Sequence, residues 1–245
     1  MLTSKTARQV ILLNLLAIFA TIAIATPFDK LYRQFEDGGF ITYFSVIQLF
    51  ILSYFTCKIF KIRSQDYPTS PWKSPVAIWG ILSLGFSFLA LDDLLMIHEF
   101  IDKTIHKVWQ IEETGLTDSI DDGIIALYAI AAVAVLVSYR HELKKYRTVL
   151  PAVLIAFALL FAMIVVDAVT NRNETLEILF SAQTVEGIQD WIFTVEDGLK
   201  LLAEGFYIIA AHACLPIAQQ LHSKRSQENA LVIQSPVDSS NAGAS

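Results

Sequence analysis

Residues 75–100 read PVAIWGILSLGFSFLALDDLLMIHEF, an apolar run that ends in two aspartates, a histidine and a glutamate. The apolar part is long enough to cross about 30 Å of hydrocarbon as a helix, which takes roughly 20 residues. Ionisable side chains at membrane depth are costly, so they normally face other protein or water and mark a site. The stretch therefore predicts a membrane-spanning helix that carries Asp92, Asp93, His98 and Glu99 at one end.

The whole chain has the composition of an integral membrane protein. Of its 245 residues 54% are hydrophobic and only 17% are charged, and the mean hydropathy is +0.51. The net charge of −6, with no basic stripe to neutralise phosphates, argues against nucleic-acid binding. We expect an all-α polytopic membrane helix bundle with six transmembrane helices, at Val10–Thr26, Phe40–Phe60, Pro75–Ile97, Gly123–Tyr139, Val149–Thr170 and Trp191–Ile217.

Charge placement predicts the orientation of this bundle. Lys and Arg concentrate before the first span and after the second, fourth and sixth, which predicts that both termini are cytoplasmic. Residues 1–222 form one helix-bundle domain, and residues 223–245 are polar and small, as in a disordered cytoplasmic tail. The first span also has the features of a signal peptide with a small-residue cleavage site at Ala23-Ile24-Ala25, and whether it is cleaved stays open.

Two loops on the non-cytoplasmic side carry apolar residues of their own. In the segment 98–120, the six apolar side chains from Phe100 to Ile111 follow mixed three- and four-residue spacing, which predicts a helix lying at the membrane interface. Residues 171–190 include the apolar patch Ile178-Leu179-Phe180 and predict a second cap. We expect short interfacial helices on this side.

Acidic side chains from several spans converge on the same non-cytoplasmic side. Asp92 and Glu99 are seven positions apart, so one continuous helix would bring them within about 20° of one face. In the last span Glu196, Lys200 and Glu204 share a stripe, and Lys200 can neutralise either neighbour. Carboxylates packed this closely need protonation, a Lys partner or a divalent metal.

A metal site is our leading hypothesis, because carboxylates with a histidine suit Zn, Mn or Fe in a helix bundle. It predicts metal-dependent hydrolysis or transfer on a lipid-linked or small-molecule substrate near the membrane. Asp93 or Asp197 would act as general base. The candidate metal ligands are Asp92, His98, Glu99, Asp167 and Glu196, with Asp197 as a further acidic neighbour.

Two alternatives belong to other function classes. Glu196, Lys200 and Glu204 suit a proton or cation relay in a transporter. Alternatively the protein is a non-catalytic assembly or partner-binding membrane protein, whose charges pair internally. In every case the bilayer is a partner, and the sequence fixes neither enzymatic activity nor oligomeric state.

Two segments carry a resemblance to known proteins. LALDDLLMIHE, residues 89–99, and VEDGLKLLAEG, residues 195–205, resemble the LDE…HE and EE-x-LE-x-x-G segments of uncharacterised bacterial multi-pass membrane proteins. The departures are Asp93, where that pattern has Glu, and Asp197-Gly198 in the later segment. The resemblance implies a location in the bacterial inner (plasma) membrane and pairs the two acidic segments, but it implies no activity.

Overall fold

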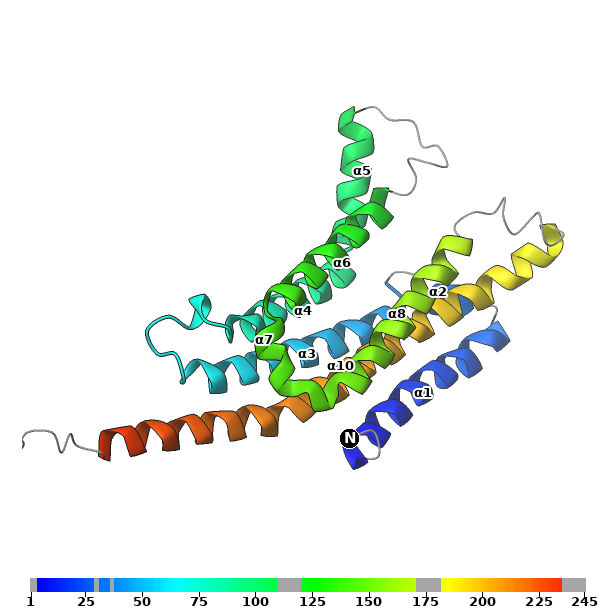
Figure 1. Ribbon diagram of the computed structural model, residues 1–245. Coiled ribbons are helices and arrows are strands. Elements are labelled where there is room, and N and C mark those ends of the chain that lie inside the picture. Colours follow the sequence, from blue (N-terminus) through cyan, green and yellow to red (C-terminus); the bar gives the residue numbers. More distant parts are fainter. Residues whose placement is uncertain (1–3, 29–30, 36–37, 110–119, 171–181, 235–245) are drawn as a thin grey trace, which may run out of the picture.

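The computed structural model describes residues 4–28, 31–35, 38–109, 120–170 and 182–234, and within these ranges it contains helices and no strand (Figure 1). The fold class predicted from composition is therefore confirmed as all-helical. In chain order the elements are α1 (Lys5–Ala25), η1 (Thr26–Phe28), α2 (Leu31–Phe35), α3 (Phe40–Ser64), η2 (Pro71–Lys73), α4 (Ala77–Leu95), α5 (Ile97–Trp109), α6 (Ile120–Ser138), α7 (Arg140–Leu143), η3 (Lys144–Val149), α8 (Leu150–Thr170) and α10 (Ala182–Gln234).

Five helical stretches in the described part are long and apolar enough to cross a membrane. They lie in α1, α3, α4, α8 with the segment before it, and α10. In α6 the apolar part is the shorter stretch Ala126–Ser138. Five of the six predicted spans thus meet this length and composition, and the chain has the structure of an integral membrane protein.

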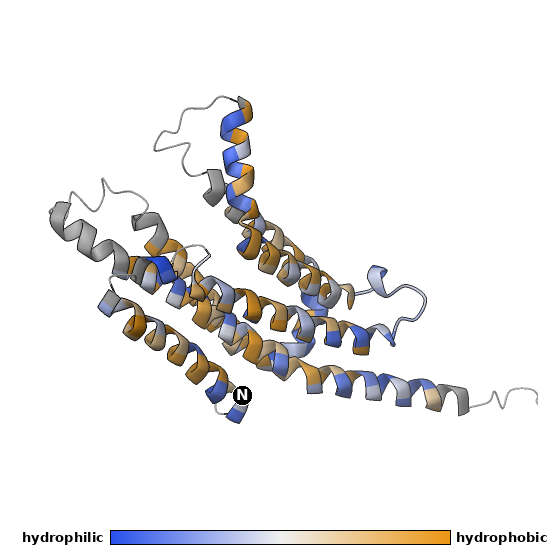
Figure 2. Ribbon diagram, turned by 180° about the vertical axis from the view of Figure 1, so that it is seen from behind, coloured by the Kyte–Doolittle hydropathy of each residue, from blue (hydrophilic) through white to orange (hydrophobic). Residues whose placement is uncertain are grey.

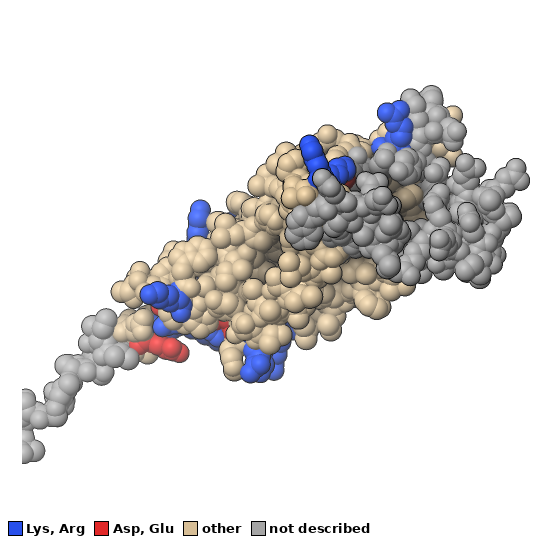
Figure 3. All heavy atoms as spheres, turned by 90° about the horizontal axis from the view of Figure 1, so that it is seen from above, with Lys and Arg blue, Asp and Glu red and all other residues tan. Residues whose placement is uncertain are grey.

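The outer surface agrees with a lipid environment. Large apolar side chains such as Leu16 on α1 and Phe161 on α8 are more than 60% exposed, and apolar positions run along the outside of the helices (Figure 2). On the face shown in Figure 3, a wide stretch without Lys, Arg, Asp or Glu separates charged groups at its two ends. Soluble domains rarely expose apolar patches of this extent, whereas membrane helices expose them to lipid.

Helix α10 is the centre of the bundle. It packs against α8, α3 and α1, and α3 also packs along α4 (Figure 1). The close approach of α1 depends on Gly205, where a Cβ atom would lie 2.1 Å from Nδ2 of Asn14. Asn14 is buried and exchanges hydrogen bonds with Gln48 of α3 at 2.8 and 3.4 Å. Helix α1 is thus joined to the bundle by a polar contact as well as an apolar one.

The corner between α4 and α5 corrects one geometric prediction. Met96 adopts φ +50° and ends α4, so Asp92 and Glu99 lie on two different helices and share no face. Left-handed backbone is uncommon for residues other than glycine. Here Gly38, itself at φ +78° before α3, packs against the Met96 side chain. The break turns the predicted interfacial segment into a separate amphipathic helix, α5.

Helix α10 differs from expectation at its C-terminal end. The sequence predicted a disordered tail at residues 223–245, but α10 continues through Gln234. This first half of the expected tail is therefore helical, because it extends a helix already held by the bundle and helix propagation costs less than nucleation. Residues 235–245 lie outside the described part of the chain.

Candidate functional site

Asp92 stabilises the corner at which α5 begins. The Asp92 side chain is buried, and its Oδ1 accepts the backbone N–H of His98 at 2.9 Å. Its Oδ2 lies 3.2 Å from Nδ1 of the same histidine. The first N–H groups of a helix have no partner within the helix, so a carboxylate here acts as a cap. These contacts occupy both carboxylate oxygens of Asp92.

Asp93 belongs to a different group of side chains, which we call the Ser45 cluster: Ser45 of α3, Asp93 of α4, and Lys200 and Glu204 of α10. Lys200 Nζ lies 2.8 Å from Asp93 Oδ2. The Ser45 hydroxyl lies 3.0 Å from the same Asp93 oxygen and 2.7 Å from Glu204 Oε1. Ser45 and Glu204 are both buried. Three helices thus contribute to one charged centre inside the bundle.

The Ser45 cluster continues into the Asn14–Gln48 amide pair. Gln48 follows Ser45 by three residues on α3, and Asn14 contacts Gly205, the neighbour of Glu204. Farther along α3, Ser53 lies 2.7 Å from Ser87 of α4. Polar groups buried in a membrane protein are retained where they bind one another or a ligand. The buried face of α3 therefore carries polar side chains well beyond the charged centre.

The predicted site residues separate into distinct groups. Asp92 and His98 contact each other, while Asp93, Lys200 and Glu204 meet in the Ser45 cluster. Glu99 forms an ion pair with Lys103 one turn later on α5. Glu196, Lys200 and Glu204 lie on one continuous helix, α10, and the ion-pair partner of Lys200 is Asp93 from another helix.

The remaining candidates are Glu196, Asp197 and Asp167. Glu196 and Asp197 are partly buried on α10, one turn before Lys200. Asp167 falls in α8, and its side chain lies outside the described part of the structure. Among the side chains that the structure describes, no group of three His, Cys, Asp or Glu is placed to hold a metal ion. The metal site with Zn, Mn or Fe therefore stays a prediction.

Sequence reasoning missed a second charged cluster at the opposite end of α3. Arg63 is buried and donates from Nε and Nη2 to Glu142 of α7 at 3.2 Å. It also pairs with Asp66, whose other oxygen lies 2.7 Å from Nδ1 of His222 on α10. Lys145 pairs with Glu142. These side chains stand in loops and helix ends that we interpreted only as a basic cytoplasmic side.

Ser45, Gln48 and Asn14 were missed as well, although a signal was present. Thr42, Ser45 and Gln48 recur every three residues in the first half of a largely apolar span, which places them near one face of a helix. Neutral polar side chains are common in transmembrane helices, so nothing in their spacing connects these residues with acids far along the chain. Their role follows from contacts between helices.

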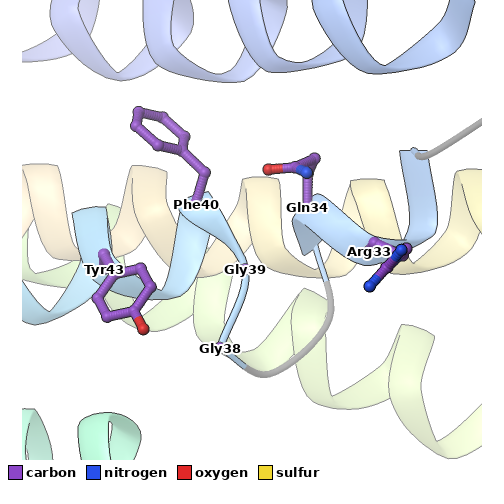
Figure 4. A pocket seen from close by; sticks show the side chains of 6 residues that line it. All are labelled: Arg33, Gln34, Gly38, Gly39, Phe40 and Tyr43. Atoms are coloured by element: carbon purple, nitrogen blue, oxygen red, sulfur yellow. The ribbon is translucent and has the colours of Figure 1, made fainter. Parts of the chain in front are cut away.

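A surface hollow of about 490 Å³ lies at the turn from α2 to α3 (Figure 4). Arg33 and Gln34 line it from α2, and Phe40 and Tyr43 line it from α3. It includes none of the residues of the Ser45 cluster. The charged centre is thus packed among helices and is separate from this hollow.

Comparison with known proteins gives the family. A family model described as "Domain of unknown function (DUF8692)" matches residues 7–215, from the first helix to the middle of α10. Both acidic segments fall inside this range. No curated protein and no solved structure matches the chain. Since the match covers most of the sequence, the chain belongs to the family of the Domain of unknown function (DUF8692).

Proposed function

We propose that the protein is a membrane transporter in which a proton or another cation moves through the Ser45 cluster. The observation that carries this proposal is the contact of the buried Ser45 with Asp93 and the buried Glu204, together with the ion pair of Asp93 with Lys200. Ionisable side chains inside transmembrane bundles are rare because they are costly, and they mark ion pathways and proton relays. A charge pair that served stability alone is readily replaced by apolar packing.

Polar side chains toward the basic end of the bundle support the same function. A relay requires polar groups beyond the charged centre, and α10 supplies few of them after Glu204. Helix α3 supplies them instead, through Gln48, Ser53 and Thr56, and ends in the buried Arg63. In this proposal the ion path follows the interface of α3 with its neighbours.

We place the transporter in a bacterial inner membrane with six spans and both termini in the cytoplasm. Helix α6 would complete the set of six spans, because the whole helix is longer than its apolar stretch Ala126–Ser138 and begins at Ile120. Helix α5 would lie along the non-cytoplasmic surface of the membrane, because its polar and apolar positions repeat with helical spacing, as in an interfacial helix (Figure 2). The Ser45 cluster would then be nearer the non-cytoplasmic face.

Metal-dependent hydrolysis or transfer has less support. A Lys ammonium in contact with Asp93 supplies the positive charge that a metal ion would otherwise supply. Asp92 is satisfied by the first turn of α5 and by His98. A non-catalytic assembly protein predicts that substitutions in the Ser45 cluster change stability and leave any flux unchanged.

Flux through proteoliposomes tests the proposal. Purified protein is reconstituted, and proton and monovalent-cation movement are followed after a pH jump or a potassium–valinomycin potential. We expect flux in wild type that is lost in Lys200→Met and in Asp93→Asn. Glu99→Gln is the matched control, because it removes a carboxylate at the same end but outside the cluster.

The outcomes separate the hypotheses. Flux that persists in Lys200→Met, or that is absent in correctly folded wild type, refutes the transporter. A turnover that depends on Glu99 and on added Zn, Mn or Fe would instead support the metal hypothesis.

A further inference from the structure

Ser45 lies between two carboxyl groups but has only one hydrogen to donate. Its Oγ is 2.7 Å from Glu204 Oε1 and 3.0 Å from Asp93 Oδ2, and the side chain is 1% exposed. A serine hydroxyl donates one hydrogen and accepts through its lone pairs, whereas an ionised carboxylate only accepts. If both acids were ionised, one of the two short contacts would join oxygens with no hydrogen between them. One of the two acids must therefore carry a proton.

The surroundings of the two acids decide which one is protonated. Asp93 Oδ2 receives the Lys200 ammonium at 2.8 Å in addition to Ser45, so the ionised form of Asp93 is stabilised. Glu204 is 5% exposed, and its Oε2 is buried without a hydrogen-bond partner among the described residues. An ionised carboxylate with one bare oxygen would be costly there, while a neutral acid leaves a much weaker acceptor unpaired.

The other groups around Glu204 are consistent with this assignment. On α1 and α3, Asn14 and Gln48 donate their amide hydrogens to each other. On α10, Asp197 lies seven residues before Glu204 and near the same face, where a second negative charge disfavours ionisation of Glu204. Lys200 is the positive group one turn before Glu204 on that helix, and its ammonium forms its ion pair with Asp93 at 2.8 Å.

We propose that Glu204 is a proton-binding site and that Ser45 passes its proton to Asp93. In the transfer, the Glu204 O–H bond breaks and its hydrogen forms an O–H bond with Ser45 Oγ. At the same time the original O–H bond of Ser45 breaks, and that hydrogen forms an O–H bond with Asp93 Oδ2. Ser45 ends as a neutral hydroxyl, Glu204 as a carboxylate and Asp93 as a neutral acid. Lys200 stays charged and, four residues before Glu204 on α10, is in reach of the new carboxylate.

The net charge of the cluster is the same before and after this transfer, with one ammonium and one carboxylate in each state. A proton can thus change sites without creating an unpaired charge inside the membrane. This inference rests on the proposed function, which it deepens by naming the proton as the ion that the cluster holds.

Infrared spectroscopy of the full-length protein in lipid nanodiscs tests the proton-binding site. We expect wild type at neutral pH to show the carbonyl stretch of a protonated carboxylic acid, shifted on exchange into D₂O. The band should be lost in Glu204→Gln and kept in Asp197→Asn, which removes a nearby carboxylate of the same helix. No such band in wild type, or a band unchanged in Glu204→Gln, overturns the assignment; the wild-type measurement decides even if the variant fails to fold.

Substitution of Ser45 tests the transfer itself. Ser45→Ala should keep a protonated acid but lose proton flux, and Ser45→Thr, which restores a hydroxyl, should regain it. Proton flux in Ser45→Ala equal to that of wild type overturns the role of Ser45. The acid band without any flux would refute the transporter and leave the proton site intact, whereas flux without the band would refute the proton site alone.

Discussion

The contact of Lys200 with Asp93 gives the sharpest stability prediction. Replacing Lys200 with Met keeps the length of the side chain and leaves the Asp93 carboxylate without its ammonium. Breaking a fully buried ion pair costs about 3–5 kcal/mol. The Lys200 and Asp93 side chains are 30% and 16% exposed, so we expect a smaller loss in the free energy of unfolding, about 2–3 kcal/mol.

A double-mutant cycle isolates the pair. Asp93→Asn alone leaves the Lys200 ammonium unpaired, whereas Asp93→Asn combined with Lys200→Met removes both charges. We expect the double variant to lose less than the sum of the single losses, with a coupling energy of about 2 kcal/mol. The measurement is denaturant unfolding in detergent micelles, with the slopes compared to verify that the unfolding transition is the same.

Lys103→Met is the matched control for this cycle. It breaks the ion pair with Glu99, in which the Lys103 side chain is 72% exposed. Exposed pairs contribute little, so the loss should stay within about 0.5 kcal/mol. Strictly additive losses for the Asp93 and Lys200 variants, or a control that loses as much as Lys200→Met, would refute the reasoning.

Three further predictions concern other parts of the molecule. Gly205→Ala should destabilise the protein by about 1–3 kcal/mol through overpacking against α1, while Gly85→Ala, with open space at its Cβ, should be neutral or slightly stabilising; unfolding measurements compare the two. Glu142→Gln should cost about 3 kcal/mol because it leaves the buried Arg63 guanidinium with one acidic partner fewer, and an unchanged denaturation midpoint would contradict this. Metal analysis of purified protein should find no stoichiometric Zn, Mn or Fe; about one ion per chain, lost in Asp92→Ala, would revive the metal hypothesis.

The sequence predicted those parts of the fold that depend on composition and on periodicity within one helix. Long apolar runs predicted helices of the length and composition that α1, α3, α4, α8 and α10 have, because a helix satisfies its backbone hydrogen bonds within one segment. The shared stripe of Lys200 and Glu204 followed from helical spacing alone. Both results are local to a segment, so they need no knowledge of neighbouring helices.

What depends on contacts between segments was not predictable. The sequence around the break at Met96 contains no glycine or proline that would predict it. The break is stabilised by the packing of Gly38 and by the hydrogen bond from the His98 backbone to Asp92. Likewise, Ser45 is one of several neutral polar residues in its span. Its position between Asp93 and Glu204 exists only after three helices have packed. The sequence thus singled out Asp93, Lys200 and Glu204 one by one, while Ser45, the residue that contacts both acids, was missed.

Helix α10 has a mechanical consequence that follows from its length. Its 53 residues extend about 80 Å at 1.5 Å per residue, more than twice the thickness of the hydrocarbon layer. Lys200 and residues 223–234 are therefore parts of one long helix, and a small tilt of this helix inside the bundle becomes a larger displacement at its outer end. Pro216 lies between them and removes one backbone hydrogen bond, so it is the point where the helix bends most easily.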